Sequence, residues 1–214
     1  MEHCYAILDR MARPRVHDAA LHGRLLQTAA HLVAENGAGS VSMRRLASAA
    51  GTSTTAVYSL FGGRPALFAA LHAAAFADFG AAQHAAPISD DPVQDLMALA
   101  HAYRDWALSH PQLYAVMFAG ALGNHLPPDL DPQPALDTMR PLENATARFI
   151  ASGRAVPDAS TARLSIALWS AVHGFVSLEL LQFLDPDATA GRQSYTWAMS
   201  ALLRGWTAQP GPVP

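Results

Sequence analysis

The sequence predicts an all-α protein with a small N-terminal domain and a larger C-terminal one. Apolar residues recur every three to four positions through most of the chain, which is the period of a helix with one buried face. No segment keeps the alternation of apolar and polar residues that is typical of a strand. Of the 214 residues, 51% are hydrophobic and 14% are charged, so the chain can bury a sizeable core. Breaks rich in glycine and proline divide it into about nine helices.

The first three helices are defined by capping residues. The first spans about residues 17–35. Ser42 is placed to cap the N-terminus of the second helix, and Gly51 to end that helix in a left-handed conformation. Thr52 or Ser53 can cap the third helix.

Proline residues mark the following helices. Pro65 and Pro92 each lie in a first helical turn. Backbone amides there have no acceptor within the helix, so the amide hydrogen that proline lacks is not missed. The helix that starts near Pro92 ends before Pro111, because the residue preceding a proline avoids helical geometry. The remaining helices are expected over about residues 111–122, 135–152, 160–184 and 192–206.

The segment 164–184 has about the length of a membrane span, roughly 20 residues. It also contains His173 and Glu179, and a charge in mid-span costs about 2.5–3.5 kcal/mol. We therefore interpret it as a helix buried between its own domain and a partner, with Glu179 as a surface or interface charge. No membrane association is predicted.

The single cysteine, Cys4, excludes a disulfide within the chain and fits a reducing compartment. The first ten residues contain no long apolar region typical of a signal peptide. A cytoplasmic protein is therefore expected. Met11 begins a plausible alternative start, which leaves open whether residues 1–10 belong to the native protein.

The two short helices between residues 42 and 61 predict a helix-turn-helix. Their apolar positions recur at helical spacing, and Val57 and Phe61 lie four residues apart on the third helix. Two such helices joined by a short turn containing glycine describe this motif, whose second helix commonly enters a DNA major groove.

This region resembles the DNA-binding domain of the TetR family of transcriptional regulators. Two departures stand out: that family usually has Lys-Glu where this chain has Arg64-Pro65, and often glycine where it has Thr55. Arg64 keeps the positive charge for a phosphate contact, and Thr55 adds a hydroxyl to the surface facing DNA. The resemblance is carried by Gly37, Ser42 to Ala47, Ala50 to Ser53, Val57, Tyr58, Phe61, Arg64 and Leu67.

The C-terminal half resembles a subgroup of TetR-like ligand-binding domains. Trp169 and the pair His173-Gly174 are similar to the W…HG signature of that subgroup, and residues 110–118 are similar to its junction between the fifth and sixth helices. The resemblance implies a DNA-binding domain over residues 12–65 and a ligand-binding and dimerisation domain over residues 66–208.

The charge distribution fits such a division. Residues 1–65 carry seven arginines and four acids, whereas residues 66–214 carry seven arginines and thirteen acids. A basic N-terminal part on an acidic body is typical of a DNA-reading module joined to another domain.

The DNA-binding candidates are basic or hydroxyl-bearing residues around the motif. Arg44 and Arg45 are either phosphate anchors or a solvated basic pair. Thr54 and Thr55 are expected at base edges and Tyr58 at a phosphate, the alternative being an ordinary polar surface. The full set is Ser42, Arg44, Arg45, Ser53, Thr54, Thr55, Tyr58, Ser59 and Arg64.

The ligand-binding candidates are aromatic and methionine side chains on the central helices. Such a set is either core or the wall of a mostly apolar cavity with a few polar anchors. Because few charges lie among them, an apolar or aromatic effector held by one or two hydrogen bonds is expected. They are Tyr103, Trp106, Tyr114, Met117, Phe118, Trp169, His173 and Phe175.

Neither a metal site, a cofactor nor an enzyme activity is predicted. His17, His22 and His31 lie on one helix, but their spacings of five and nine residues do not place two ligands at i and i+4. The sequence contains no zinc-protease motif, nucleophile elbow, phosphate loop or dinucleotide fingerprint.

The predicted function is a ligand-responsive, homodimeric transcriptional regulator, a repressor that a small effector releases from a double-stranded operator. The two C-terminal helices are expected to pair with their two-fold mates as a four-helix bundle, with Leu168 and Met199 in the contact. The alternative is an all-helical ligand-binding or assembly protein without operator binding. The effector, the operator, and repression versus activation are left open.

Overall fold

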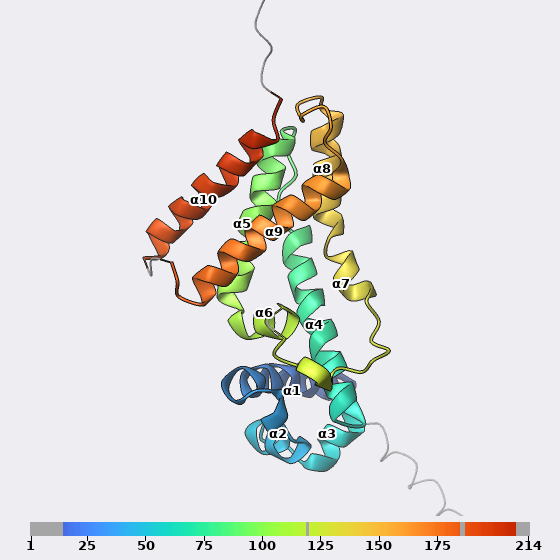
Figure 1. Cartoon of the computed structure of the whole chain (residues 1–214). Coiled ribbons are helices and arrows are strands. Elements are labelled where there is room, and N and C mark those ends of the chain that lie inside the picture. The colour runs from blue at the N-terminus through green and yellow to red at the C-terminus, as the bar shows by residue number, and fades with distance from the viewer. Residues whose placement is uncertain (1–14, 119, 185–186, 209–214) are drawn as a thin grey trace, which may run out of the picture. The chain divides into compact units, whose positions relative to one another are not determined.

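The structure, a computed structural model, describes residues 15–118, 120–184 and 187–208 and confirms the all-α prediction (Figure 1). Residues 1–10, whose origin the sequence left open, lie outside the described part. Within these ranges the only β-type pairing is an isolated bridge between Ala155 and Thr207. The elements are α1 (Arg15–Asn36), η1 (Ala38–Ser40), α2 (Met43–Ala49), α3 (Thr54–Phe61), α4 (Arg64–His84), α5 (Pro92–Ser109), α6 (Pro111–Phe118), η2 (Gly123–His125), α7 (Gln133–Asp137), α8 (Arg140–Ala151), α9 (Thr161–Leu180) and α10 (Ala188–Gly205), where η denotes a 3-10 helix.

The chain forms two compact units. Among the described residues, the N-terminal unit comprises 15–74, 115–118 and 120–130, and the C-terminal unit comprises 75–114, 131–184 and 187–208. Both α4 and α6 therefore contribute residues to each unit.

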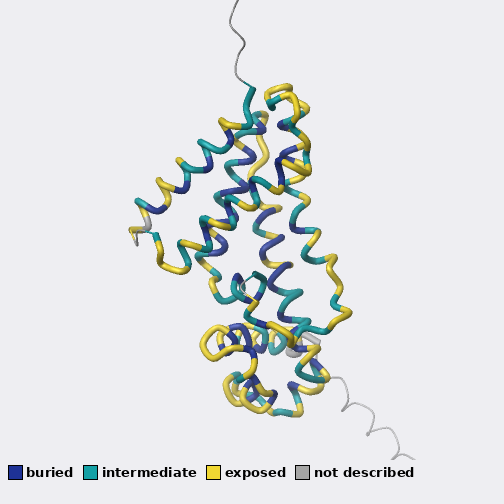
Figure 2. Tube along the Cα trace, in the orientation of Figure 1, coloured by how far each residue is buried: buried dark blue, intermediate teal, exposed yellow. Residues whose placement is uncertain are grey.

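The N-terminal unit is built on α1, α2 and α3, which contact one another pairwise. Leu25 and Ala29 of α1, Leu46 of α2 and Val57 of α3 are completely buried. The outer turns of α2 and α3 are exposed (Figure 2). The two short helices thus present one face to the core and the other to solvent.

The C-terminal unit is built on α5, α8, α9 and α10. Its core contains Leu96, Phe149, Leu164, Leu168 and Leu203. Helix α9 packs against α5, α8 and α10, which places this apolar helix against three neighbours.

Several expected helix boundaries differ in the structure, among them the end of α9, which lies at Leu180 and not near residue 184. The segment predicted as one helix over residues 135–152 is divided into α7 and α8, with Pro141 in the first turn of α8. The sixth helix ends at Phe118 and is followed by η2. Helix α10 begins at residue 188 because Asp187 caps it, accepting from the amides of Thr189 at 2.8 Å and Ala190 at 3.3 Å.

Helix α4 is the one described helix that is long and apolar enough to cross a membrane. Its Leu67, Phe68 and Leu71 are completely buried. Helices that are buried in a protein core meet the same length and composition criteria.

Candidate nucleic-acid interface and ligand cavity

The turn between α2 and α3 is fixed by glycine. Gly51 has φ 65°, which side chains with a Cβ rarely adopt. Around it the Thr52 amide donates to Ala47 O at 2.9 Å and the Gly51 amide to Ser48 O at 3.3 Å. These two bonds form a Schellman motif, so the predicted left-handed end of α2 is confirmed.

Serine hydroxyls cap both helices of the motif. Ser42 Oγ accepts from the Arg45 amide, and Ser53 Oγ accepts from the Ala56 amide, each at 3.1 Å. The sequence had left the cap of α3 open between Thr52 and Ser53, and the structure places Ser53 there. Each hydroxyl keeps its own proton, which is available for donation to an acceptor outside the protein.

The polar candidates on α3 lie opposite its buried face. Thr55, Tyr58 and Ser59 are exposed and Thr54 is half-buried, whereas Val57 and Phe61 are buried. A row of hydroxyls therefore follows the solvent side of α3. On α2, Arg44 and Arg45 are both exposed.

Arg64 has an internal role in the N-terminal unit. Its Nη2 donates to Ala38 O at 2.6 Å, and its guanidinium lies over the Phe68 ring with 5.2 Å to the centroid. These contacts join the start of α4 to η1. The geometry favours a positioning role for Arg64 over the phosphate contact expected from the sequence.

The ligand-binding candidates are divided between the two units. Tyr103, Trp106 and Tyr114 are buried in the C-terminal unit, where Trp169, His173 and Phe175 are half-buried. Met117 and Phe118 belong to the N-terminal unit.

Two tyrosines converge on His173. The hydroxyls of Tyr103 and Tyr114 lie 2.9 Å and 3.1 Å from His173 Nδ1, and Tyr114 also contacts Ser177 Oγ at 2.9 Å. Burial lowers the pKa of His173 and raises the pKa of both tyrosines. A neutral imidazole whose Nδ1 accepts from a tyrosine hydroxyl therefore suits this cluster.

Acidification is expected to destabilise the protein through three half-buried histidines. Burial lowers the pKa of His72, His101 and His173 from 6.5, so the unfolded chain binds more protons than the folded one. The free energy of unfolding is therefore highest above pH 6.5, the pKa of an unperturbed histidine, and it decreases as the pH falls below that value. Urea unfolding at about pH 7.5 and about pH 5.5 measures the difference, and His173→Gln should reduce it. A free energy of unfolding that stays level or rises on acidification would contradict this expectation.

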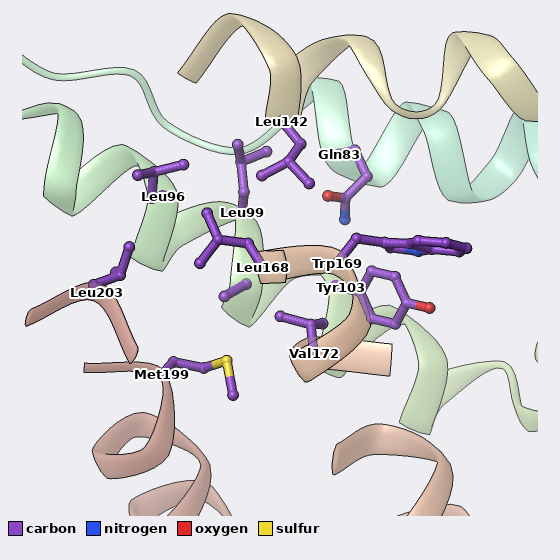
Figure 3. Close-up of a pocket in the computed structure, with 11 residues that line it drawn as sticks. Gln83, Leu96, Leu99, Tyr103, Leu142, Leu168, Trp169, Val172, Met199 and Leu203 are labelled. Atoms are coloured by element: carbon purple, nitrogen blue, oxygen red, sulfur yellow. The ribbon is translucent and has the colours of Figure 1, made fainter. Parts of the chain in front are cut away.

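A small apolar cavity lies among α4, α5, α8, α9 and α10 of the C-terminal unit (Figure 3). Its volume is about 40 Å³. Pockets that hold drug-sized ligands have volumes of about 300–1,000 Å³, so a ligand of that size must enlarge this cavity. The lining residues are Gln83, Leu96, Leu99, Ala100, Tyr103, Leu142, Leu168, Trp169, Val172, Met199 and Leu203.

Only two of the predicted ligand-binding residues, Tyr103 and Trp169, line this cavity. Sequence reasoning missed the other nine, most of which are aliphatic and carry no pattern that separates a cavity wall from a core. Two of them, Leu168 and Met199, were expected in a dimer contact. The structure corrects this, because both are buried inside their own unit.

Trp106 and Phe175 have other partners. Trp106 Nε1 donates to Asp78 Oδ2 at 2.8 Å, and Phe175 packs edge-on against Tyr195 with centroids 5.2 Å apart. Neither residue lines the cavity of Figure 3.

The sequence suggested that Glu179 is a surface or interface charge, whereas the structure pairs it with Arg104 inside the C-terminal unit. Its carboxylate accepts from both Nε and Nη2 of Arg104, with 2.8 Å for the Nε bond. The two side chains are only 12% and 4% exposed. The result is a largely buried, bidentate ion pair between α5 and α9.

Comparisons with known proteins agree with this architecture. Residues 25–71 match the family described as bacterial regulatory proteins, tetR family, and residues 96–202 match the tetracyclin repressor-like C-terminal domain. The second match contains Trp169 and His173.

Among individual proteins, the HTH-type transcriptional regulator Rv1816 of Mycobacterium tuberculosis is 26% identical over 148 residues. That match covers 67% of this chain and 63% of the length of the regulator.

Solved structures show the same fold. A protein of unknown function from Rhodococcus sp. RHA1 has a TM-score of 0.73 and 27% identity, covering 88% of this chain and 96% of the other. The TetR family regulator PfmR from Thermus thermophilus has a TM-score of 0.69 and 21% identity, covering 85% and 97%. The family matches extend over both halves of the chain and include the helix-turn-helix. The chain therefore belongs to the TetR family of bacterial transcriptional regulators.

Proposed function

We propose that this regulator is a cytoplasmic, homodimeric repressor that binds a double-stranded operator and leaves it when a small apolar or aromatic effector binds. The observation that supports DNA binding most directly is the helix-turn-helix. Its turn and both caps are fixed by hydrogen bonds, and its solvent face carries Arg44, Arg45 and the hydroxyls of α3. A rigid helix with exposed donors is what major-groove reading requires.

In this proposal the exposed residues have separate tasks. Arg44 and Arg45 bind phosphates, which position the protein on DNA without reading sequence. Thr54 and Thr55 contact base edges, and Tyr58 contacts a phosphate. Ser42, Ser53 and Ser59 add hydroxyl donors, and Arg64 positions the start of α4.

The dimer is proposed to form through α9 and α10. Ile166 and Leu178 of α9 are exposed, although they lie on the most apolar helix of the C-terminal unit, and Trp197 of α10 is exposed as well. Ile166, Ser170, Gly174 and Leu178 are four residues apart and share one stripe of α9. This exposed stripe, with apolar residues at both ends and small residues between them, is called the apolar stripe of α9, and exposed apolar surface of this kind marks a protein interface.

The effector is proposed to bind the cavity of Figure 3 and to enlarge it. Because α4 contributes residues both to the cavity-bearing unit and to the unit with the helix-turn-helix, a displacement of α4 would couple the two sites. Effector binding would then change the distance between the two DNA-binding domains of the dimer. That distance must match operator half-sites about one DNA turn apart.

The test is binding to DNA that flanks the protein's own gene. Arg45→Ala should weaken binding about fivefold to all sequences and reduce the slope of log affinity against log salt by about 0.9, because one phosphate contact is lost. Thr55→Ala should instead change the base preference and leave the salt slope unaltered. Fluorescence anisotropy over a series of salt concentrations measures both effects.

Arg140→Ala is the matched control, because Arg140 is also an exposed arginine but lies on α8. It should leave the affinity and the salt slope unchanged. Wild-type protein without any salt-sensitive DNA binding would favour the alternative, an all-helical ligand-binding or assembly protein.

A further inference from the structure

Gln83 is the feature of the cavity that the apolar-effector proposal leaves unexplained. It lies near the end of α4 and is only 6% exposed, and its Nε2 is buried without a hydrogen-bond partner in the protein. Burying an amide group without a hydrogen-bond partner costs free energy. Unpaired buried amides are therefore uncommon in folded proteins, and each one calls for a structural or functional explanation.

The Gln83 amide faces an otherwise apolar space. Figure 3 shows its nitrogen directed toward Trp169, on the side of the cavity that Tyr103 also lines. The Tyr103 hydroxyl is already bonded to His173 Nδ1. Gln83 Nε2 is therefore an unpaired donor that a molecule reaches only when it enlarges the cavity.

A second cavity of about 140 Å³ also has Gln83 in its lining. Gln83 and Leu99 line both cavities, so the two spaces adjoin at these side chains, which we call the partition. Their displacement would join the two spaces. The second cavity is lined by Gln83, His84, Ala86, Pro87, Ile88, Asp95, Leu99, Pro141, Asn144, Ala145 and Arg148.

The charges near the partition are already paired. Arg148 Nη1 binds Asp95 Oδ2, and Asp95 Oδ1 accepts from the Ser89 amide at 2.7 Å. No residue that lines the inner cavity is charged. An ionised ligand would thus lose its hydration without gaining a free counter-charge.

We propose that Gln83 selects the effector, building on the function proposed above: the ligand is an uncharged, mainly hydrocarbon molecule with an oxygen acceptor that receives a hydrogen bond from Gln83 Nε2. Its hydrocarbon body occupies the inner cavity. Its entry displaces the Gln83 and Leu99 partition and joins the two spaces.

The proposal is tested with two probes of similar shape, acetophenone and ethylbenzene, which differ by a carbonyl in place of a methylene. NMR titration of the full-length protein should give at least tenfold tighter binding of the ketone, since a donor left unpaired by the hydrocarbon rejects it. In Gln83→Met, whose side chain has a similar volume and no donor, this ratio should fall to about one. The variant Gln27→Met, at an exposed glutamine of α1, should keep the wild-type ratio.

Two results obtained with the Gln83→Met variant would overturn the proposal. One is an unchanged preference for the ketone in Gln83→Met. The other is a melting temperature of Gln83→Met well below that of the wild type, which would identify the amide as a structural partner. Operator binding is measured separately, so wild-type protein that binds its operator but does not prefer the ketone refutes the role of Gln83 and leaves the repressor function standing.

Discussion

Glu179→Ala is expected to destabilise the protein by about 3–5 kcal/mol, the cost of leaving a buried charge without its partner. Arg104 is 4% exposed, and Glu179 accepts from two of its nitrogens. The next carboxylate oxygen, Asp105 Oδ1, is 3.9 Å from Arg104 Nη1. The Arg104 guanidinium also lies over the Tyr195 ring, so it cannot reach solvent without disturbing that contact. Urea denaturation followed by circular dichroism measures the loss.

The exposed pair Arg192 and Asp105 is the matched control. Arg192 Nη1 lies 2.7 Å from Asp105 Oδ1, but the two side chains are 51% and 48% exposed. Arg192→Ala should therefore cost about 1 kcal/mol or less. If Glu179→Ala costs no more than Arg192→Ala, the ion pair is solvated and its assignment to the core is wrong.

A double variant separates the cost of an unpaired charge from the value of the pair. Arg104→Met combined with Glu179→Leu removes both charges and keeps a similar volume. It should recover most of the stability lost in Glu179→Ala, because apolar replacements of buried ion pairs are often neutral or stabilising. A double variant that is as unstable as Glu179→Ala would show that packing, and not the charge, is responsible.

The helix-turn-helix could be predicted in detail because its determinants are local. Ser42 caps the helix that begins at the next residue, and Gly51 ends that helix through bonds within five residues. Capping residues and positive φ are properties of short sequence segments. The sequence therefore contained both the elements and the turn between them.

The C-terminal site could not be predicted in the same way because its contacts are distant in the sequence. Arg104 and Glu179 are 75 residues apart in the sequence. The residues that line the cavity together with Gln83 of α4 come from four other helices, α5, α8, α9 and α10. Amphipathic periodicity shows that Leu168 and Met199 are buried. It does not show whether they face their own unit or a second protomer, because both environments are apolar.

The exposed apolar stripe of α9 yields the second large prediction. Ile166→Asp should raise the dimer dissociation constant by at least a hundredfold, because the two-fold axis places two unpaired charges in one interface. Ile166 is 52% exposed, so the change leaves the core of its own unit intact. Trp197→Asp should act in the same way, since Trp197 is 70% exposed on the neighbouring α10. Sedimentation velocity at micromolar concentration measures the dissociation.

Leu136→Asp is the control, because Leu136 is a similarly exposed apolar residue but lies on α7. It should sediment as the wild type does. Leu168→Asp should behave differently from Ile166→Asp, since it buries a charge in the core and should unfold the protein rather than give folded monomers. An obligate dimer of this kind should bury more than about 2,000 Å² in total. Wild-type protein that is monomeric at micromolar concentration, or Ile166→Asp protein that stays dimeric, would show that this stripe is not the dimer interface.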